Sequence, residues 1–216
     1  MKFSIDAMIV QLVKDEKKLN EVTDYLFNLL ERHSLFQASE YLALKVLNEK
    51  SCTIDNDLAK QLESYRAMKK GNIAPDIHFS NVNLPLGYSV NVELKKISDI
   101  QSNHKLVIFG ASSCPQCAEE LIKVKKLYSK WKSKGIEVIF VSLDENKTTY
   151  QNFVKPFPFI STCDLQKWES NIIKDYYVFG TPTMYLLNDK REIILRPTSA
   201  KQMDAWVDWA LKKENK

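Results

Sequence analysis

Two cysteines placed where a buried strand would pass into a helix constrain the fold of this chain more than any other feature. Cys114-Pro115-Gln116-Cys117 follows an apolar run at residues 106–111 and opens a long amphipathic segment. The free N–H groups and the positive dipole end of a helix N-terminus stabilise a thiolate. We therefore expect the pKa of Cys114 to fall from about 8.5 to about 3.5–7.5, with Cys117 close enough to form a disulfide with it.

A zinc site and a purely structural role are the alternatives for this motif. A closed zinc site needs two further ligands, usually a second close pair. The other cysteines, Cys52 and Cys163, stand alone, and no histidine lies at ligand spacing from another histidine. The sequence therefore favours dithiol redox chemistry without a metal, while a structural pair stays open. Cys52 and Cys163 themselves are expected to be inert buried thiols.

The composition is that of a soluble globular protein. Of the 216 residues, 44% are hydrophobic and 27% charged, with a net charge of +4. The lysines are scattered without a basic block, so no nucleic-acid partner is expected. No apolar stretch has the length of a membrane span, and Asp6 falls where a signal peptide would be apolar. The sequence as it stands predicts a cytoplasmic protein, and a periplasmic or membrane-anchored one would require that a signal was removed.

The chain is expected to have two parts with a boundary near Gly71. Residues 1–70 have the apolar spacing of helices, which we expect at about 19–30, 35–46 and 55–68. Gly71 can end the last helix, and Pro75 favours extended backbone before it. The first part is therefore a small all-helical region, without any catalytic constellation.

The second part, residues 71–216, alternates strands with helices. Two short runs at 77–79 and 88–94 predict an N-terminal β-hairpin across a turn at 85–87. Further strands are expected at 105–111, 136–143, 184–187 and 192–195, with helices at 115–134, 146–154 and 165–177 and a last helix from about 199. This order predicts an α/β fold with a mixed central sheet and helices on both faces.

Four motifs in this order resemble the thioredoxin superfamily, within it the TlpA/ResA-like thiol–disulfide oxidoreductases. They are Gly71-Asn72-Ile73-Ala74-Pro75-Asp76, the Cys114–Cys117 motif, Glu120, and Gly180-Thr181-Pro182-Thr183. The resemblance covers residues 71–216 and implies a thioredoxin-like fold. Residues 1–70 resemble N-terminal extensions of such proteins in Bacteroides-type bacteria. The chain departs from the family where Ser113 replaces the usual tryptophan before the first cysteine and Leu121-Ile122 replaces the usual Met-Pro.

The resemblance implies a role for each site residue. Cys114 would be the nucleophile and Cys117 the resolving thiol on the helix stripe that faces the core. Glu120, three residues later, would accept the proton of Cys117, although spacing alone would also fit a solvated helix glutamate. Substrate contacts would come from the motif residues Pro115 and Gln116 and from Thr181 and Pro182, the latter in a cis peptide bond.

The implied reaction is the reduction or exchange of protein disulfides, with no cofactor besides the Cys114–Cys117 pair. Its partners would be a disulfide-containing protein substrate and an upstream membrane thiol reductase. A peroxiredoxin-like peroxidase is a second hypothesis, although Ala111 stands where that class has threonine in its T-x-x-C motif. A non-catalytic thioredoxin-like binding module is a third.

Overall fold

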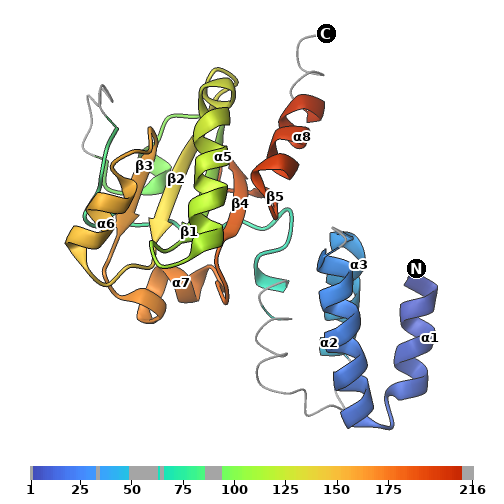
Figure 1. Cartoon of the computed structure of the whole chain (residues 1–216). Helices are drawn as coiled ribbons and strands as arrows, with labels where there is room; N and C mark the ends of the chain where they lie inside the picture. The colour runs from blue at the N-terminus through green and yellow to red at the C-terminus, as the bar shows by residue number, and fades with distance from the viewer. Residues whose placement is uncertain (1, 33–34, 49–62, 64–65, 86–93, 211–216) are drawn as a thin grey trace. The chain divides into compact units, whose positions relative to one another are not determined.

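The apolar patterns of the chain build two units, each with a hydrophobic core of its own, in a computed structural model (Figure 1). The structure describes residues 2–32, 35–48, 63, 66–85 and 94–210. The units comprise Met1–Lys69 and Lys70–Lys216. The sequence-based boundary lies between residues 70 and 71, next to this division.

The first unit consists of helices in its described part. These are α1 (Lys2–Leu12), α2 (Glu16–Arg32) and α3 (Phe36–Asn48). On each helix, apolar side chains three or four residues apart lie on the buried side and pack against the other helices, as amphipathic spacing requires. The predicted helix at 55–68 falls almost wholly outside the described residues, as does Cys52. The buried core comprises Ile5, Ile9, Leu19, Phe27, Leu30, Leu42, Ala43 and Val46.

The second unit is built on a five-stranded sheet in the order β3-β2-β1-β4-β5. The central strand β1 (His104–Gly110) pairs in parallel with β2 (Ile136–Ser142), which pairs in parallel with β3 (Ile160–Cys163). On its other side β1 pairs antiparallel with β4 (Thr183–Asn188), which leads into β5 (Ile193–Leu195). The mixed sheet confirms the predicted fold class.

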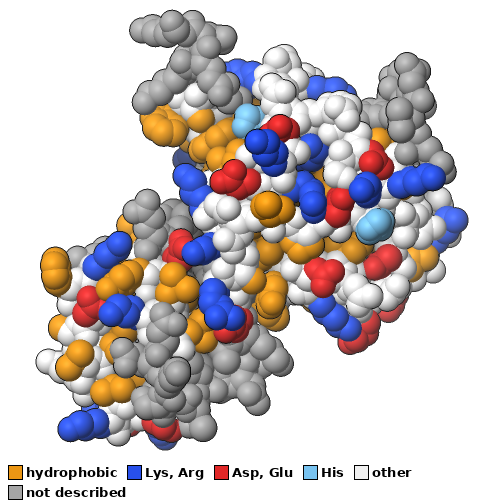
Figure 2. Space-filling view, turned by 180° about the vertical axis from the view of Figure 1, so that it is seen from behind, with side chains coloured by type: hydrophobic (Ala, Val, Ile, Leu, Met, Phe, Trp, Pro, Cys, Tyr) orange, Lys and Arg blue, Asp and Glu red, His pale blue; other side chains and the backbone are white. Residues whose placement is uncertain are grey.

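Helices cover both faces of this sheet. On one face, α5 (Pro115–Lys132), α6 (Lys147–Val154) and α8 (Ala200–Ala210) share a core with β1 and β2. On the other face, Tyr176, just after α7 (Asn171–Asp175), packs its ring 5.1 Å from that of Phe109 on β1. On the surface of Figure 2, basic and acidic side chains are interspersed. None of the described helices combines the length and the apolar character that crossing a membrane needs.

The sequence prediction was wrong for one helix and missed one strand. Residues 165–177 form a 3-10 turn, η2 (Lys167–Glu169), and the short α7 in place of a continuous helix. The backbone is left-handed at Leu165 (φ 64°) and Lys167 (φ 54°), and Ser170 is extended (ψ 131°), so the helix cannot continue. The missed strand is β3, a run of four residues that follows the loop prolines.

The predicted N-terminal hairpin is only partly within the described residues. His78 forms a single antiparallel bridge with Lys96, flanked by hydrogen bonds between Phe79 N–H and the Lys95 carbonyl and between Ile97 N–H and the Ile77 carbonyl. Residues 77–79 thus make a bridge and not a regular strand. Residues 86–93, which hold the turn and most of the predicted second strand, lie outside the described part.

Candidate active site

Cys114 and Cys117 form a disulfide where β1 passes into α5. A short turn separates strand and helix, in which the Cys114 N–H donates to the Ala111 carbonyl at 3.1 Å. The Cα atoms of the two cysteines are 5.3 Å apart, a separation typical of disulfides. The strand therefore delivers both sulfur atoms to the first turn of the helix.

Cys114 is the N-cap residue of α5. Its backbone is extended (φ −97°, ψ 107°), and its Sγ accepts the Cys117 N–H at 3.2 Å. Pro115 occupies the first helical turn, where no intrahelical N–H bond is lost. Cys114 is half-buried, whereas Cys117 is 1% exposed. Only one sulfur of the pair is thus accessible to a partner.

Gly110 makes room for the buried sulfur. A Cβ atom at this position would lie 3.2 Å from Cys117 Sγ and 2.9 Å from the ring of Phe140. The distance to Phe140 is shorter than real Cβ atoms show, and the distance to Cys117 is tighter than most, so glycine lets both the helix and the Phe140 ring lie this close to the end of β1. Sequence reasoning did not single out Gly110, although its place between the apolar run and the motif was a signal for such an approach.

The loop before β4 lies beside the disulfide. The Thr181–Pro182 peptide bond is cis. The carbonyl oxygen of Thr181 lies 3.6 Å from Cys114 Sγ, and Thr183 Oγ1 donates to the Gly180 carbonyl at 2.7 Å. An open pocket of about 580 Å³ adjoins this loop, lined by Gln116, Glu119, Glu120, Gly180, Thr181, Pro182, Thr183 and Thr198. Of the seven predicted site residues, this pocket brings together Gln116, Glu120, Thr181 and Pro182.

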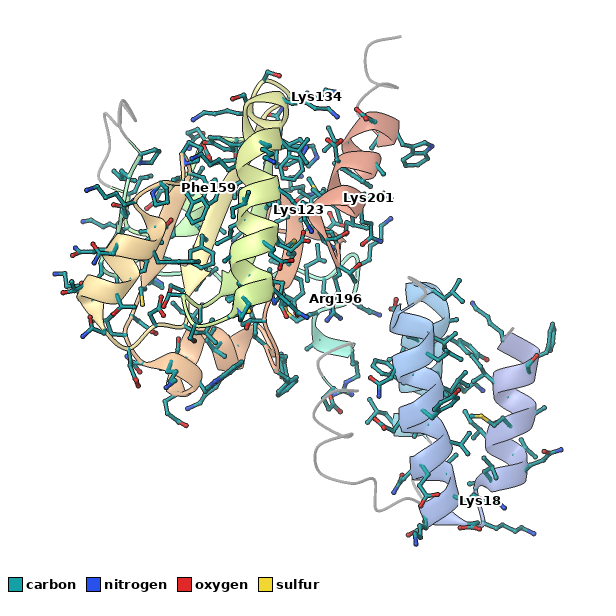
Figure 3. The ribbon with its side chains drawn as sticks, viewed as in Figure 1. Lys18, Lys123, Lys134, Phe159, Arg196 and Lys201 are labelled. Carbon is teal, nitrogen blue, oxygen red and sulfur yellow. A yellow bond between two sulfur atoms is a disulfide. The ribbon has the colours of Figure 1, made fainter. Side chains whose placement is uncertain are left out.

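Both carboxylate oxygens of Glu120 have partners in this disulfide form. Oε1 accepts from Lys123 Nζ at 2.7 Å, and Oε2 accepts the Ala200 N–H at the start of α8, also at 2.7 Å. Lys123 lies on the side of α5 toward α8 (Figure 3). The side chain of Glu120 is 13% exposed. In the described part of the chain, no hydrogen bond joins Glu120 to Cys114 or Cys117. To accept the proton of Cys117, Glu120 would first have to break its bond to Lys123 or to Ala200.

Comparisons with known proteins agree with this geometry. The sequence model of a thioredoxin-like family matches residues 104–193. Thiol-disulfide oxidoreductase ResA of Bacillus thuringiensis subsp. konkukian is 30% identical over 125 residues, which cover 57% of this chain and 71% of that protein. The chain belongs to the ResA-type thiol–disulfide oxidoreductases. The family predicted from the sequence motifs is thereby confirmed.

Other matches to this ResA-type chain support the fold. Sporulation thiol-disulfide oxidoreductase A of Bacillus subtilis is 27% identical over 128 residues, covering 54% of this chain and 74% of that protein. The thioredoxin domain of a Bacteroides vulgatus thiol-disulfide oxidoreductase superposes with a TM-score of 0.55 at 20% identity, covering 66% and 97% of the two chains. A thioredoxin-like protein from Bacteroides caccae has a TM-score of 0.62 at 16% identity, covering 89% and 74%. The last match extends beyond residues 70–216 into the helical unit.

Sequence reasoning missed one polar residue of the ResA-type site. Asp144 follows β2 and accepts hydrogen bonds from Ser112, in the turn before Cys114. Parallel strands end at the same edge of a sheet, so its position directly after β2 was the available signal. Cys163 at the end of β3 is a buried free thiol, and burial raises its pKa. In the described ranges, no group of three or more His, Cys, Asp or Glu side chains could hold a metal ion.

Proposed function

We propose that this protein reduces or exchanges disulfides of partner proteins through its Cys114–Cys117 dithiol. The observation that carries the proposal is the disulfide at the N-terminus of α5, with Cys114 Sγ 3.6 Å from the Thr181 carbonyl. Cys114 is half-buried and can meet a partner, whereas Cys117 is buried and cannot. An asymmetric pair of this kind suits an attack by one thiol and a release by the other.

The reaction begins with the reduced dithiol. The Cys114 thiolate attacks one sulfur of the substrate disulfide, forms a mixed disulfide and releases the other substrate sulfur as a thiolate. Cys117 then loses its proton and attacks Cys114 Sγ. The Cys114–Cys117 disulfide forms, and the second substrate thiolate leaves. Two electrons have passed to the substrate, and an upstream thiol reductase in the membrane would return the dithiol to its reduced form.

Residues around the pair would assist these steps. The Cys117 N–H, 3.2 Å from Cys114 Sγ, would stabilise the attacking thiolate. Glu120 would take the proton of Cys117 after releasing Ala200 or Lys123. The backbone of Thr181 before cis-Pro182 would pair with an extended substrate segment, with the exposed Pro115 and Gln116 beside it.

The site residues all lie in residues 70–216, and the helical unit would serve as a spacer, a dimer surface or a docking platform. The cellular compartment, cytoplasmic or extracytoplasmic, stays a prediction. Fractionation of the native host cells would test it.

Replacing each cysteine in turn tests the assignment of the two thiols. Cys117→Ser keeps the nucleophile but removes the resolving thiol, so it is expected to accumulate covalent protein adducts that reducing agent removes. Cys114→Ser leaves Cys117 as the one thiol of the pair, and because it is buried this variant is expected to trap little. The measurement is a non-reducing gel of full-length protein incubated with an oxidised protein, and Cys163→Ser is the matched control for a buried thiol without a role. Equal trapping by the two variants would contradict the assignment.

Two other functions give different outcomes. A peroxidase would consume peroxide without a thiol acceptor, and a binding module would leave an insulin disulfide intact. Family membership and the accessible Cys114 favour disulfide exchange over both.

A further inference from the structure

Asp144 is a buried carboxylate beside the turn that leads to Cys114. It lies just after β2 and is 7% exposed. Oδ1 accepts the Ser112 hydroxyl at 2.7 Å and the Ser112 N–H at 3.2 Å, and Oδ2 accepts the Ser142 hydroxyl at 2.7 Å. The Asp144 carbonyl in turn lies 3.2 Å from the Cys163 thiol, which donates to it. We call Ser112, Ser142 and Asp144 the carboxylate clamp.

The clamp fixes the backbone immediately before the nucleophile. Both donors of Ser112 are used by one carboxylate, so the turn has little freedom relative to the end of β2. Ser112 is two residues before Cys114, a separation of at most about 7 Å between their Cα atoms. The helix N-terminus stabilises the Cys114 thiolate only while Cys114 Sγ stays within hydrogen-bond distance of the Cys117 N–H. A rigid turn before the N-cap keeps it there.

The clamp also holds a carboxylate against Ser112, two residues before the nucleophile in the chain. The partners of Asp144 are neutral hydroxyl and amide groups, and no ion pair to it occurs among the described residues. Neutral donors solvate a buried carboxylate but do not cancel its charge. A thiolate at Cys114 adds a second negative charge to the same turn, and like charges disfavour each other more than a charge and a neutral residue do.

We propose that Asp144 is a positioning residue for Cys114, which holds the nucleophile over the helix N-terminus through Ser112 and limits the stability of its thiolate through its own charge. The proposal rests on the proposed function, since it concerns the attacking thiol of that reaction. It assigns two opposing effects to one side chain. Different substitutions can separate them.

Alkylation of reduced full-length protein by iodoacetamide separates the effects. The rate at Cys114 is followed by mass spectrometry as a function of pH, and the midpoint of the profile is compared between variants. Ser112→Ala removes one clamp bond and is expected to raise the midpoint by about half a pH unit. Asp144→Asn keeps an acceptor for Ser112 but removes the charge, and is expected to lower the midpoint by about half a unit or more. Ser112→Thr keeps the hydroxyl and should restore the wild-type profile.

Glu145→Gln is the matched control, because it removes a carboxylate at the next position, where the side chain is 67% exposed and pairs with Lys167. Its midpoint is expected to move by less than about 0.2 unit. Unfolding by urea is measured for all variants. A purely structural Asp144 would lower stability without moving either midpoint, and that result would overturn the proposal. Shifts in the same direction for Ser112→Ala and Asp144→Asn, or an equal shift for Glu145→Gln, would overturn it too.

The readout is independent of turnover on a protein substrate. If disulfide exchange fails but the two midpoints move in opposite directions, the proposed function is wrong and the positioning role holds. If Cys117→Ser traps substrates but the midpoints stay fixed, the proposed function holds and the positioning role of Asp144 is wrong.

Discussion

Glu120 in the disulfide form bonds to Lys123 and to the backbone of Ala200. The spacing of the sequence placed it near Cys117, but it could not show that the N-terminus of α8 would supply a competing donor. A carboxylate in this position can act on Cys117 only when the site rearranges during exchange. This makes its role testable by a substitution that keeps its shape.

Glu120→Gln is expected to keep the fold, because the amide oxygen can still accept the Ala200 N–H. Resolution of the mixed disulfide should slow by roughly tenfold or more, since a positioned general base contributes at least that much. Stopped-flow measurement of substrate thiol release between about pH 6 and pH 9, a range that brackets an ordinary cysteine pKa, would detect the change. Glu169→Gln, whose side chain is 85% exposed, is the control. A wild-type rate and pH profile in Glu120→Gln would rule the role out.

Among single residues, the sequence predicted those whose position depends on neighbours in the chain. Cys114 and Cys117 are set by one strand-to-helix junction, which the apolar run and the motif define together. Asp144 and Gly110 depend on contacts between elements. The Asp144 carboxylate reaches Ser112 from the loop after β2, and the glycine matters because Phe140 and Cys117 pack against it. Contacts between elements that are distant in the chain cannot be predicted from the spacing of residues along the sequence.

Elements are joined by partly buried polar residues as well as by the core. Asp76, in the entry segment of the second unit, accepts the Ser98 hydroxyl at 2.7 Å and the Ser98 N–H at 3.1 Å, and it pairs with Lys96 at 3.5 Å. Burial opposes ionisation of this carboxyl, but the bonds from Ser98 and the charges of Arg191 and Lys96 outweigh it. The pKa of Asp76 is therefore lowered from its ordinary value of 3.8.

A lowered pKa in the folded state makes the contribution of Asp76 depend on pH. The ionised carboxylate stabilises the fold above its unfolded pKa of about 3.9, and the contribution is lost as the pH falls through the lower folded value. Asp76→Asn is expected to reduce the free energy of unfolding by about 1 kcal/mol at pH 7 and by much less near pH 3. Urea unfolding at both pH values would measure this. Asp175 is exposed, so Asp175→Asn should change the free energy of unfolding little at either pH. An equal loss at both pH values in Asp76→Asn would contradict the argument.

Among the elements, those with strong periodicity were predicted well and the short ones were not. β1, β2 and α5 have long apolar or amphipathic patterns that only one structure satisfies. β3 covers four residues, too few for alternation to be visible. The apolar residues at 165–177 have helical spacing, but left-handed backbone at Leu165 and Lys167 interrupts the helix. The packing of Tyr176 against Phe109 favours this interrupted backbone.

At the scale of the whole chain, the redox pair, the cis-proline loop and the clamp all belong to residues 70–216. This unit has its own sheet and core. Expressed without residues 1–69, it is expected to fold and to keep a disulfide-exchange rate close to that of the full chain. Insulin reduction and circular dichroism of the two forms would check this. A folded but redox-inactive fragment would show that the helical unit contributes to the site.

The cross-link at the start of α5 joins residues only three apart in sequence. Entropic stabilisation by a disulfide grows with the length of the loop that it closes, and a loop this short restrains little of the unfolded chain. The large contributions to stability come instead from the covered sheet. Opening the bond is therefore expected to leave the sheet and the helices that cover it in place. In the proposed reaction this disulfide carries electrons, whereas the stability of the fold comes from other residues.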